Sequence, residues 1–242
     1  WMHGVIDDNG RWIENLSDTS TAWNHQWRTR GSQPGFGVKQ TSQFLISKSS
    51  DDGLTWSEPV NLTRVCKKED WWLWAPAPGN GITLDDGTLV FPTQGRDKTG
   101  EPFSNISYSM DGGINWKTSA PAFTNTTECA VVQLDDGSLM LNMRNNRNRN
   151  NEGPDNGRAV AVTGNLGETW TMHPTSQNAL IEPVCMASLY KHVYLKNDNR
   201  RSIFFFSNPS TKSRRHHITI KASLDNGNTW PEKYQLLLDE GT

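Results

Sequence analysis

Apolar and polar residues alternate with a period of two over much of this chain, which is the pattern of half-buried β-strands. The clearest case is the stretch of residues 128–144, which reads E-C-A-V-V-Q-L-D-D-G-S-L-M-L-N-M-R. Its apolar residues lead into the turn signal Asp135-Asp136-Gly137 and alternate again after it. The pattern predicts a β-hairpin with strands over residues 128–134 and 138–144.

The two ends of this predicted hairpin carry opposite charges. Glu128 lies eight residues before Asp136, and Arg144 lies eight residues after it. A hairpin folded about Asp136 therefore places a carboxylate beside a guanidinium at its open end. The pair is either a structural salt bridge or half of an active site, and the hairpin by itself leaves both interpretations open.

The same succession of strands and turns recurs along the chain. After the hairpin, a polar loop over 145–157 leads to a strand over 158–163 and to a fourth strand after Trp170. Comparable strands are expected over 82–84 and 88–91, and again over 185–190, 202–207 and 217–223. No window shows a sustained period of 3.6 residues. The chain is therefore predicted to be all-β, with four-stranded antiparallel sheets.

A motif of eight residues, S-x-D-x-G-x-T-W, recurs after the third strand of each unit. Its four copies span residues 49–56, 109–116, 163–170 and 223–230, and their tryptophans lie 54 or 60 residues apart. The Asp or Asn at the third position can accept hydrogen bonds from the loop backbone, and the Gly at the fifth permits a positive φ. The motif is that of the Asp-box, or BNR repeat, of β-propellers. We therefore predict a propeller of four-stranded blades, with about four blades in the chain.

The topology of a blade separates these turns from the charged pair. In an up-and-down sheet the Asp-Asp-Gly turns and the Asp-boxes lie at the same end, so we interpret the Asp-boxes as structural turns. The opposite end collects the starts of the first and third strands and the ends of the second strands. The candidate residues at that end are Gln94, Glu128, Arg144, Arg214 and Arg215. Charged side chains from adjacent blades are thus expected to converge on one rim.

Six segments resemble those of bacterial exo-α-sialidases (neuraminidases), from about residue 22 to the C-terminus. They are A-P-A-P-G-N-G-I at 75–82, F-P-T-Q at 91–94, N-T-T-E at 125–128, L-N-M-R at 141–144, E-P-V-C-M-A-S at 182–188, and S-N-P at 207–209 followed by R-H-H-I-T at 215–219. The resemblance implies a retaining glycoside hydrolase with a six-bladed propeller that acts on sialylated glycoconjugates. Residues 1–242 would then form one partial sialidase-like domain, with about four of the blades.

The resemblance also implies roles for individual residues. Glu128 matches the glutamate that activates a tyrosine nucleophile. Arg144 and Arg215 match two of three arginines that bind the carboxylate of sialic acid, and Arg214 is the less fitting neighbour of Arg215. Gln94 occupies the equivalent rim position and is expected to bond substrate hydroxyls or the N-acyl group. A guanidinium fork suits a carboxylate, and a phenol avoids the repulsion that an anionic nucleophile meets beside it.

Three parts of the implied machinery have no counterpart in the chain. The first arginine and the acid/base aspartate belong before the first Asp-box blade, and the nucleophilic tyrosine belongs after the last one. Four tyrosines do not match the context of that nucleophile: Tyr108, Tyr190, Tyr194 and Tyr234. Of these, Tyr108 and Tyr190 are expected in strands, and Tyr234 in a fourth strand. We therefore expect the isolated chain to be inactive or nearly so.

Composition limits the other functions. The formal net charge is -2, which argues against a nucleic-acid partner, and no apolar run has the length of a membrane span. Cys66, Cys129 and Cys185 lack the spacing of zinc ligands, and no metal or cofactor is indicated. Cys129 and Cys185 are expected to be buried thiols in strands. The chain shows no signal peptide, whereas the resemblance implies a secreted, periplasmic or cell-surface protein.

Two questions stay open at this point. Trp71, Trp72 and Trp74 either line a sugar pocket or pack between blades, and a second aromatic cluster lies at residues 23–27. The chain is also compatible with a non-catalytic Asp-box propeller that binds glycans or proteins. Glu128 at this spacing favours the enzyme, because a lectin needs arginines for a carboxylate but has no need of an activating glutamate.

Overall fold

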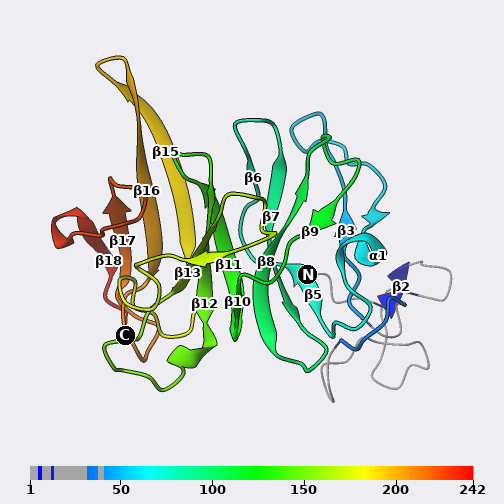
Figure 1. Ribbon diagram of the computed structural model, residues 1–242, viewed down its shortest axis with the longest axis horizontal. Helices are drawn as coiled ribbons and strands as arrows, with labels where there is room; N and C mark the ends of the chain where they lie inside the picture. The colour runs from blue at the N-terminus through cyan, green and yellow to red at the C-terminus, as the bar shows by residue number, and fades with distance from the viewer. Residues whose placement is uncertain (1–4, 7–11, 14–31, 38–40, 242) are drawn as a thin grey trace. The chain divides into compact units, whose positions relative to one another are not determined.

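The computed structural model describes residues 5–6, 12–13, 32–37 and 41–241 (Figure 1). The chain divides into two compact units. The first comprises residues 1–76 and 95–101, and the second comprises residues 77–94 and 102–242. The candidate site residues of the sequence all belong to the second unit.

The first unit contains short strands and one helix. Its elements are β1 (Val5–Ile6), β2 (Trp12–Ile13), β3 (Leu45–Ile46), β4 (Val60–Asn61), α1 (Thr63–Cys66) and β5 (Trp74–Pro76). Strand β1 pairs with β2, and β3 pairs with β4, both antiparallel. Helix α1 has four residues and is the sole α-helix in the described part of the chain. The prediction that helices contribute little is therefore confirmed.

The second unit consists of successive antiparallel sheets. The first of them contains β6 (Ile82–Thr83), β7 (Leu89–Arg96), β8 (Pro102–Ser109), β9 (Lys117–Thr118) and β10 (Phe123–Thr124). The next contains β11 (Thr126–Gln133), β12 (Leu139–Asn145), β13 (Ala159–Thr163) and β14 (Thr171–Met172) in that order. The last contains β15 (Ser188–Lys196), β16 (Asn199–Pro209), β17 (Ile218–Ser223) and β18 (Gln235–Asp239). The last two sheets are the four-stranded meanders predicted for propeller blades, whereas the first has six strands.

The middle sheet is buried on both faces, which explains its apolar sequence. Leu141 and Met143 of β12 are fully buried in a cluster with Val90 and Ile106 from the preceding sheet. Met140, on the other face of β12, packs in a second cluster that includes Phe204 of β16. Figure 1 shows the sheets of this unit side by side in chain order, so each inner sheet is covered by its neighbours. A strand buried on both faces loses strict alternation and becomes nearly continuously apolar.

The predicted register of the central hairpin is confirmed. Val131 pairs with Leu141, and Cys129 pairs with Met143, which is the arrangement of a strand pair folded about Asp136. The ladder is interrupted between Thr126 and Cys129 by a bulge, and it resumes where Thr126 pairs with Asn145. Glu128 therefore sits in the irregular segment at the open end of the hairpin.

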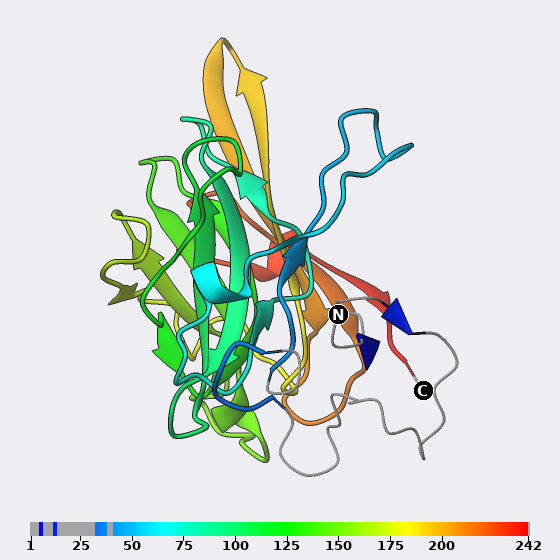
Figure 2. The same ribbon diagram turned by 90° about the vertical axis from the view of Figure 1, so that its right-hand side faces the viewer.

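Three local predictions were wrong. The β15–β16 hairpin is longer than predicted, and Figure 2 shows it extending beyond the other strands of the unit. Cys185 precedes β15 instead of lying in a strand, and it is half-buried. Tyr234 ends a 3₁₀ turn, η2 (Glu232–Tyr234), and the fourth strand starts only after it. Pro231 starts this turn and lacks the N–H that a ladder needs, which delays the strand.

The Asp-boxes are turns in which the Ser or Thr, the Asp or Asn and the Gly bond to one another, in agreement with their prediction as structural turns. In the copy at 109–116, the Ser109 hydroxyl donates to Asp111 and accepts from the Gly113 amide at 2.8 Å. Asp111 also accepts from the amide of Asn115 at 2.9 Å, and the hydrogen bonds from Asn115 lower the pKa of Asp111 to about 2. The third copy makes the same bonds with Thr163 and Asn165. An amide oxygen thus replaces the carboxylate without loss of the turn.

Candidate functional site

Glu128 and Arg144 form an ion pair at the open end of the β11–β12 hairpin. Arg144 Nη1 donates to Glu128 Oε2 at 2.6 Å. The Arg144 side chain is 20% exposed, and the Glu128 side chain is 25% exposed. The prediction that the carboxylate and the guanidinium lie side by side is confirmed. The bulge at Glu128 turns this part of the strand out of the regular ladder, a common arrangement next to binding sites.

The guanidinium of Arg144 has donors left over after this ion pair. An arginine carries five N–H donors, and the bond to Glu128 uses one on Nη1. Its Nε is buried and has no hydrogen-bond partner among the residues that the structure describes. A buried donor without a partner costs stability. A carboxylate, with two acceptor oxygens, fits such a fork.

A second ion pair, which the sequence did not reveal, lies close to the first, because Arg158 Nη2 is 3.5 Å from the backbone carbonyl of Glu128. Arg158 Nη1 and Glu182 Oε2 are 2.8 Å apart, and both side chains are fully buried. Arg158 also donates to the Asn142 side-chain oxygen at 2.7 Å. The signals that could have found this pair were an arginine directly before the apolar run 159–162 and the E-P segment that begins at Glu182.

Arg215 lies in the loop between β16 and β17 and is exposed. Its Nη2 is 3.5 Å from the carbonyl oxygen of Val184, the residue before Cys185. The carbonyl of Cys185 in turn accepts a 2.7 Å bond from Arg158. Arg215 therefore reaches the backbone segment that is tied to the end of the hairpin, although no hydrogen bond or ion pair joins it to Glu128 among the described residues. Arg214 is exposed as well, and its carbonyl accepts from the Thr211 hydroxyl.

Gln94 lies near the end of β7 and is buried. Its neighbour Thr93 accepts a 3.3 Å bond from the thiol of Cys129, the residue after Glu128. The end of β7 thus lies beside the start of β11, as the rim prediction requires. Burial raises the pKa of Cys129 to about 12, so this cysteine stays a thiol and is no nucleophile.

Of the two alternatives for Trp71, Trp72 and Trp74, the structure favours packing for Trp71 and Trp74. Trp71 and Trp74 are buried, and Trp74 packs edge-on against Phe44 with 4.7 Å between ring centroids. Trp72 is half-buried and donates to the carbonyl of Lys98 at 3.2 Å. The packing interpretation therefore holds for Trp71 and Trp74 within the first unit. The other aromatic cluster, at residues 23–27, lies outside the described residues.

No tyrosine is hydrogen-bonded to Glu128 among the described residues. Tyr108 is at the end of β8 beside the Asp-box, and burial raises the pKa of its phenol. Tyr190 and Tyr194 lie on β15, where Tyr194 stacks on His192. The lack of such a bond in the described part of the chain agrees with the interpretation that these tyrosines are not the nucleophile.

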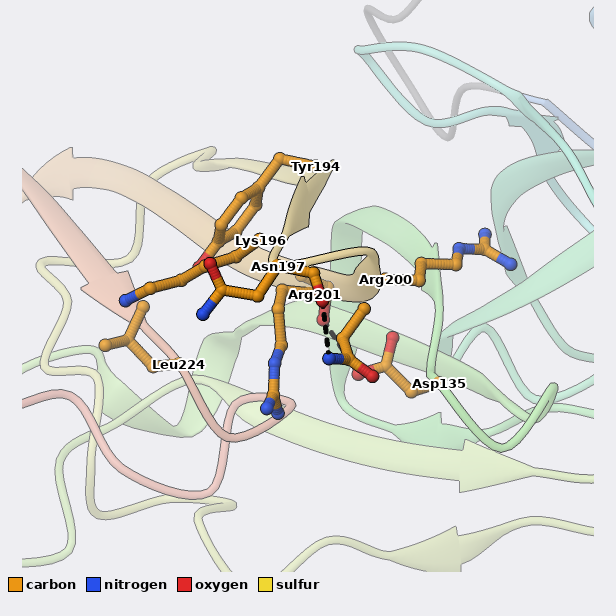
Figure 3. Close-up of a pocket in the computed structure, with 9 residues that line it drawn as sticks. Asp135, Tyr194, Lys196, Asn197, Arg200, Arg201 and Leu224 are labelled. Carbon is orange, nitrogen blue, oxygen red and sulfur yellow. Dashed lines mark hydrogen bonds between the residues drawn. The ribbon is translucent and has the colours of Figure 1, made fainter.

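A polar pocket of about 370 Å³ lies at the other end of the second unit (Figure 3). It is lined by the tip of the β15–β16 hairpin together with Asp135 and Leu224. Asp135 is already engaged by Lys191 at 2.7 Å and by the Ser202 hydroxyl at 2.8 Å. Because Asp135 belongs to the turn of the central hairpin, this pocket and the Glu128–Arg144 pair lie at opposite ends of the same strands.

The described ranges lack a metal cluster and a membrane-spanning helix. They contain no group of three or more His, Cys, Asp or Glu side chains arranged to hold a metal ion. None of their helices combines the length and the apolar character needed to cross a bilayer.

Comparison with known proteins supports the interpretation of the sequence. Residues 21–242 match the model of the BNR repeat-like domain family. The chain is 48% identical over 237 residues to a sialidase of Bacteroides fragilis, which covers 93% of this chain and 42% of that protein. It is 33% identical over 185 residues to an exo-alpha-sialidase of Arthroderma benhamiae, which covers 75% of this chain and 39% of that protein.

A solved structure gives the same result. The Hadza microbial sialidase Hz136 superposes with a TM-score of 0.78 at 46% identity, covering 87% of this chain and 39% of that one. The chain thus spans about two fifths of the length of these relatives. The resemblance to sialidases that the sequence indicated is confirmed, and the chain belongs to the family of BNR repeat-like domains.

Proposed function

We propose that this chain forms part of an exo-α-sialidase that removes terminal sialic acid from glycoproteins, glycolipids and oligosaccharides with retention of configuration. The observation that carries the proposal is the Glu128–Arg144 pair. A carboxylate and a partly unsatisfied guanidinium meet there at the mouth of a hairpin, in a chain similar to sialidases over most of its length. The substrates, the location outside the cytoplasm and the activity of the whole protein are parts of this proposal.

Arg144 is proposed to bind the substrate's carboxylate. Its bond to Glu128 uses one donor and fixes the plane of the guanidinium, so the remaining donors present a fork to an anion. The negative charge of Glu128 offsets much of the positive charge of Arg144. A second cation is therefore needed for a substrate carboxylate, and Arg215 on the adjacent loop is proposed to supply it.

Glu128 is proposed to accept the proton of a tyrosine nucleophile as the phenol oxygen attacks the anomeric carbon. The glycosidic bond breaks in the same step, and the leaving oxygen takes a proton from the acid/base group. The anomeric carbon carries the substrate's carboxylate, so a neutral phenol approaches it more readily than an anion does. The glutamate keeps 25% of its side chain exposed and is held by Arg144 on one oxygen. Its other oxygen is the one proposed to act as the base. Gln94 is proposed to bind the substrate's hydroxyl or N-acyl groups.

Turnover of a fluorogenic sialoside tests this function. The assay should use the 242-residue chain and a version extended at both ends, since the chain spans 42% of the Bacteroides fragilis relative. We expect turnover by the extended protein, and a loss of about 100-fold or more in Glu128→Gln, the range that general acid–base groups contribute. Little or no turnover is expected of the 242 residues alone.

The same experiment addresses the non-catalytic alternative. A propeller that only binds glycans would show sialoside binding without turnover, and Glu128→Gln would leave its affinity unchanged. Absence of turnover in the extended protein, together with such unchanged affinity, overturns the enzyme proposal.

A further inference from the structure

The guanidinium of Arg158 directs each of its nitrogens at an acceptor. Nε donates to the side-chain oxygen of Asn142, and Nη1 donates to Glu182 Oε2 at 2.8 Å and to the Cys185 carbonyl at 2.7 Å. Nη2 lies 3.5 Å from the carbonyl of Glu128 and 3.4 Å from that of Asn142. A side chain at the start of the third strand thus reaches the first strand, the second strand and the segment before the next sheet.

Both carboxylate oxygens of Glu182 accept hydrogen bonds. Its Oε1 accepts from the backbone amide of Asn145 at 2.6 Å and from the side-chain amide of Asn148 at 2.9 Å. Its own backbone is held from both sides by Asn156, which accepts from the Glu182 amide and donates to the Glu182 carbonyl. Asn145 is the residue after Arg144, so Glu182 fixes the peptide that carries the guanidinium of the site.

The segment after Glu182 is strained. Val184 has a φ of 53°, a left-handed conformation that a β-branched residue adopts only when its surroundings force it. Its side chain is buried, and its carbonyl faces Arg215. Glu182 anchors one side of Val184, and the bond from Arg158 to the Cys185 carbonyl anchors the other. Strain of this kind persists where neighbouring contacts over-determine the backbone.

Three sections of the proposed site therefore meet at one buried ion pair. Arg158 touches the carbonyl of Glu128, Glu182 holds the peptide after Arg144, and both hold the segment whose carbonyl contacts Arg215. We propose that Arg158 and Glu182 are positioning residues, which set Glu128, Arg144 and Arg215 in a single geometry for an anionic sugar. This inference rests on the proposed function of those three residues.

Stability by itself does not account for such a pair. Two charges taken out of water lose their hydration, and well-packed apolar residues of similar size are often as stabilising as a buried ion pair. An apolar pair, however, makes no directed bonds to Glu128, Asn145 and Cys185. The directed bonds are what a site for a carboxylate requires, because a guanidinium fork tolerates little misplacement.

The test compares a methyl α-sialoside with its C1 methyl ester, which has no charge at the carboxylate. Affinities for both are measured on the full-length protein, in the wild type, in Glu182→Gln and in Arg158→Met/Glu182→Leu. The wild type should prefer the acid. In the double variant, the ratio of the affinities for acid and ester should fall at least fivefold, and kcat/KM for the sialoside should fall at least tenfold. Glu182→Gln should lower both quantities by smaller factors. Partial unfolding lowers both binding signals equally and leaves the ratio of affinities unchanged.

Lys191→Met is the matched control, because it breaks a 2.7 Å ion pair with Asp135 at the other end of the same unit. It should leave the preference for the acid at the wild-type value. If the wild type prefers the acid and both the double variant and Glu182→Gln keep that preference, the positioning role is wrong. If the wild type shows no preference, the proposed function fails instead. Should the double variant not fold, Glu182→Gln alone decides the positioning role.

Discussion

The two ends of the second unit handle polar groups in different ways. At the turn end, the Ser or Thr, the Asp or Asn and the Gly of each Asp-box are joined by short-range bonds, as Ser223, Asp225 and Gly227 are. At the other end the bonds are long-range: Glu182 holds Asn145 from 37 residues away. One donor there, Arg144 Nε, has no partner among the described residues. A donor without a partner does not by itself separate the two ends, since Trp230 Nε1 at the turn end has none either in the described part of the chain. The difference is that short-range bonds build the turns, whereas the open end gathers charged groups from distant segments, as a site for a ligand requires.

The largest effect on stability is expected at the buried pair. Arg158→Met leaves Glu182 as an uncompensated charge with no exposed surface, which costs about 3–5 kcal/mol of the free energy of unfolding. Urea denaturation followed by tryptophan fluorescence measures this loss. A loss of less than about 1 kcal/mol is what an exposed ion pair contributes. It would mean that the buried pair matters no more for folding than the exposed pairs of the unit do.

Arg144→Met should affect binding far more than folding. Its ion pair is part-exposed, so we expect a change in the free energy of unfolding of at most about 1 kcal/mol. Loss of charge-assisted bonds to a carboxylate should weaken sialic acid binding by about 10-fold or more. Calorimetric titration with N-acetylneuraminic acid measures the affinity. Unchanged affinity in a folded Arg144→Met variant would remove Arg144 from the site.

Ser223→Ala should give the converse result at the turn end. The buried amide of Gly227 loses its acceptor, which lies 2.9 Å away, at a cost of about 1–3 kcal/mol. Turnover and sialoside affinity, measured at a temperature where the variant is folded, should stay at the wild-type level. A drop in affinity without unfolding would show that the Asp-box acts on the site.

The smallest effect concerns His173, which is buried next to Thr175. Burial lowers the pKa of His173 below its usual value of 6.5, so the folded protein prefers the neutral ring. The unfolded chain then binds more protons below pH 6.5, and stability should fall as the pH drops through that range toward the folded pKa. Urea midpoints at pH 7.5 and 5.5 should differ more in the wild type than in His173→Gln.

Much of the fold follows from local patterns, and the hairpin shows why. Val131 and Leu141 pair as predicted because the Asp-Asp-Gly turn sets the register and a slip of one residue would expose the apolar face. The Asp-boxes were predictable for the same reason, since their bonds join residues close in sequence. The ion pair at the open end followed directly from this register.

The rest of the site depends on contacts that no local pattern encodes. Arg158 and Glu182 meet across a loop and 24 residues of chain. Glu182 begins one of the segments that resemble sialidases, but no spacing in the sequence links it to Arg158. The length of the β15–β16 hairpin was also missed. Its tip is held by Arg200, whose partner Asp85 is 115 residues earlier in the chain. Such contacts appear only once the sheets are assembled.

The most direct test of the central claim is a side-by-side assay of Glu128→Gln and Ser223→Ala in the extended protein, with a fluorogenic sialoside. Both variants are measured well below their unfolding temperatures. We predict that Glu128→Gln is the more stable of the two and loses about 100-fold or more of the wild-type kcat. Ser223→Ala, although less stable, should turn over at the wild-type rate. Equal turnover by Glu128→Gln and the wild type would contradict the assignment of catalysis to this end of the blades.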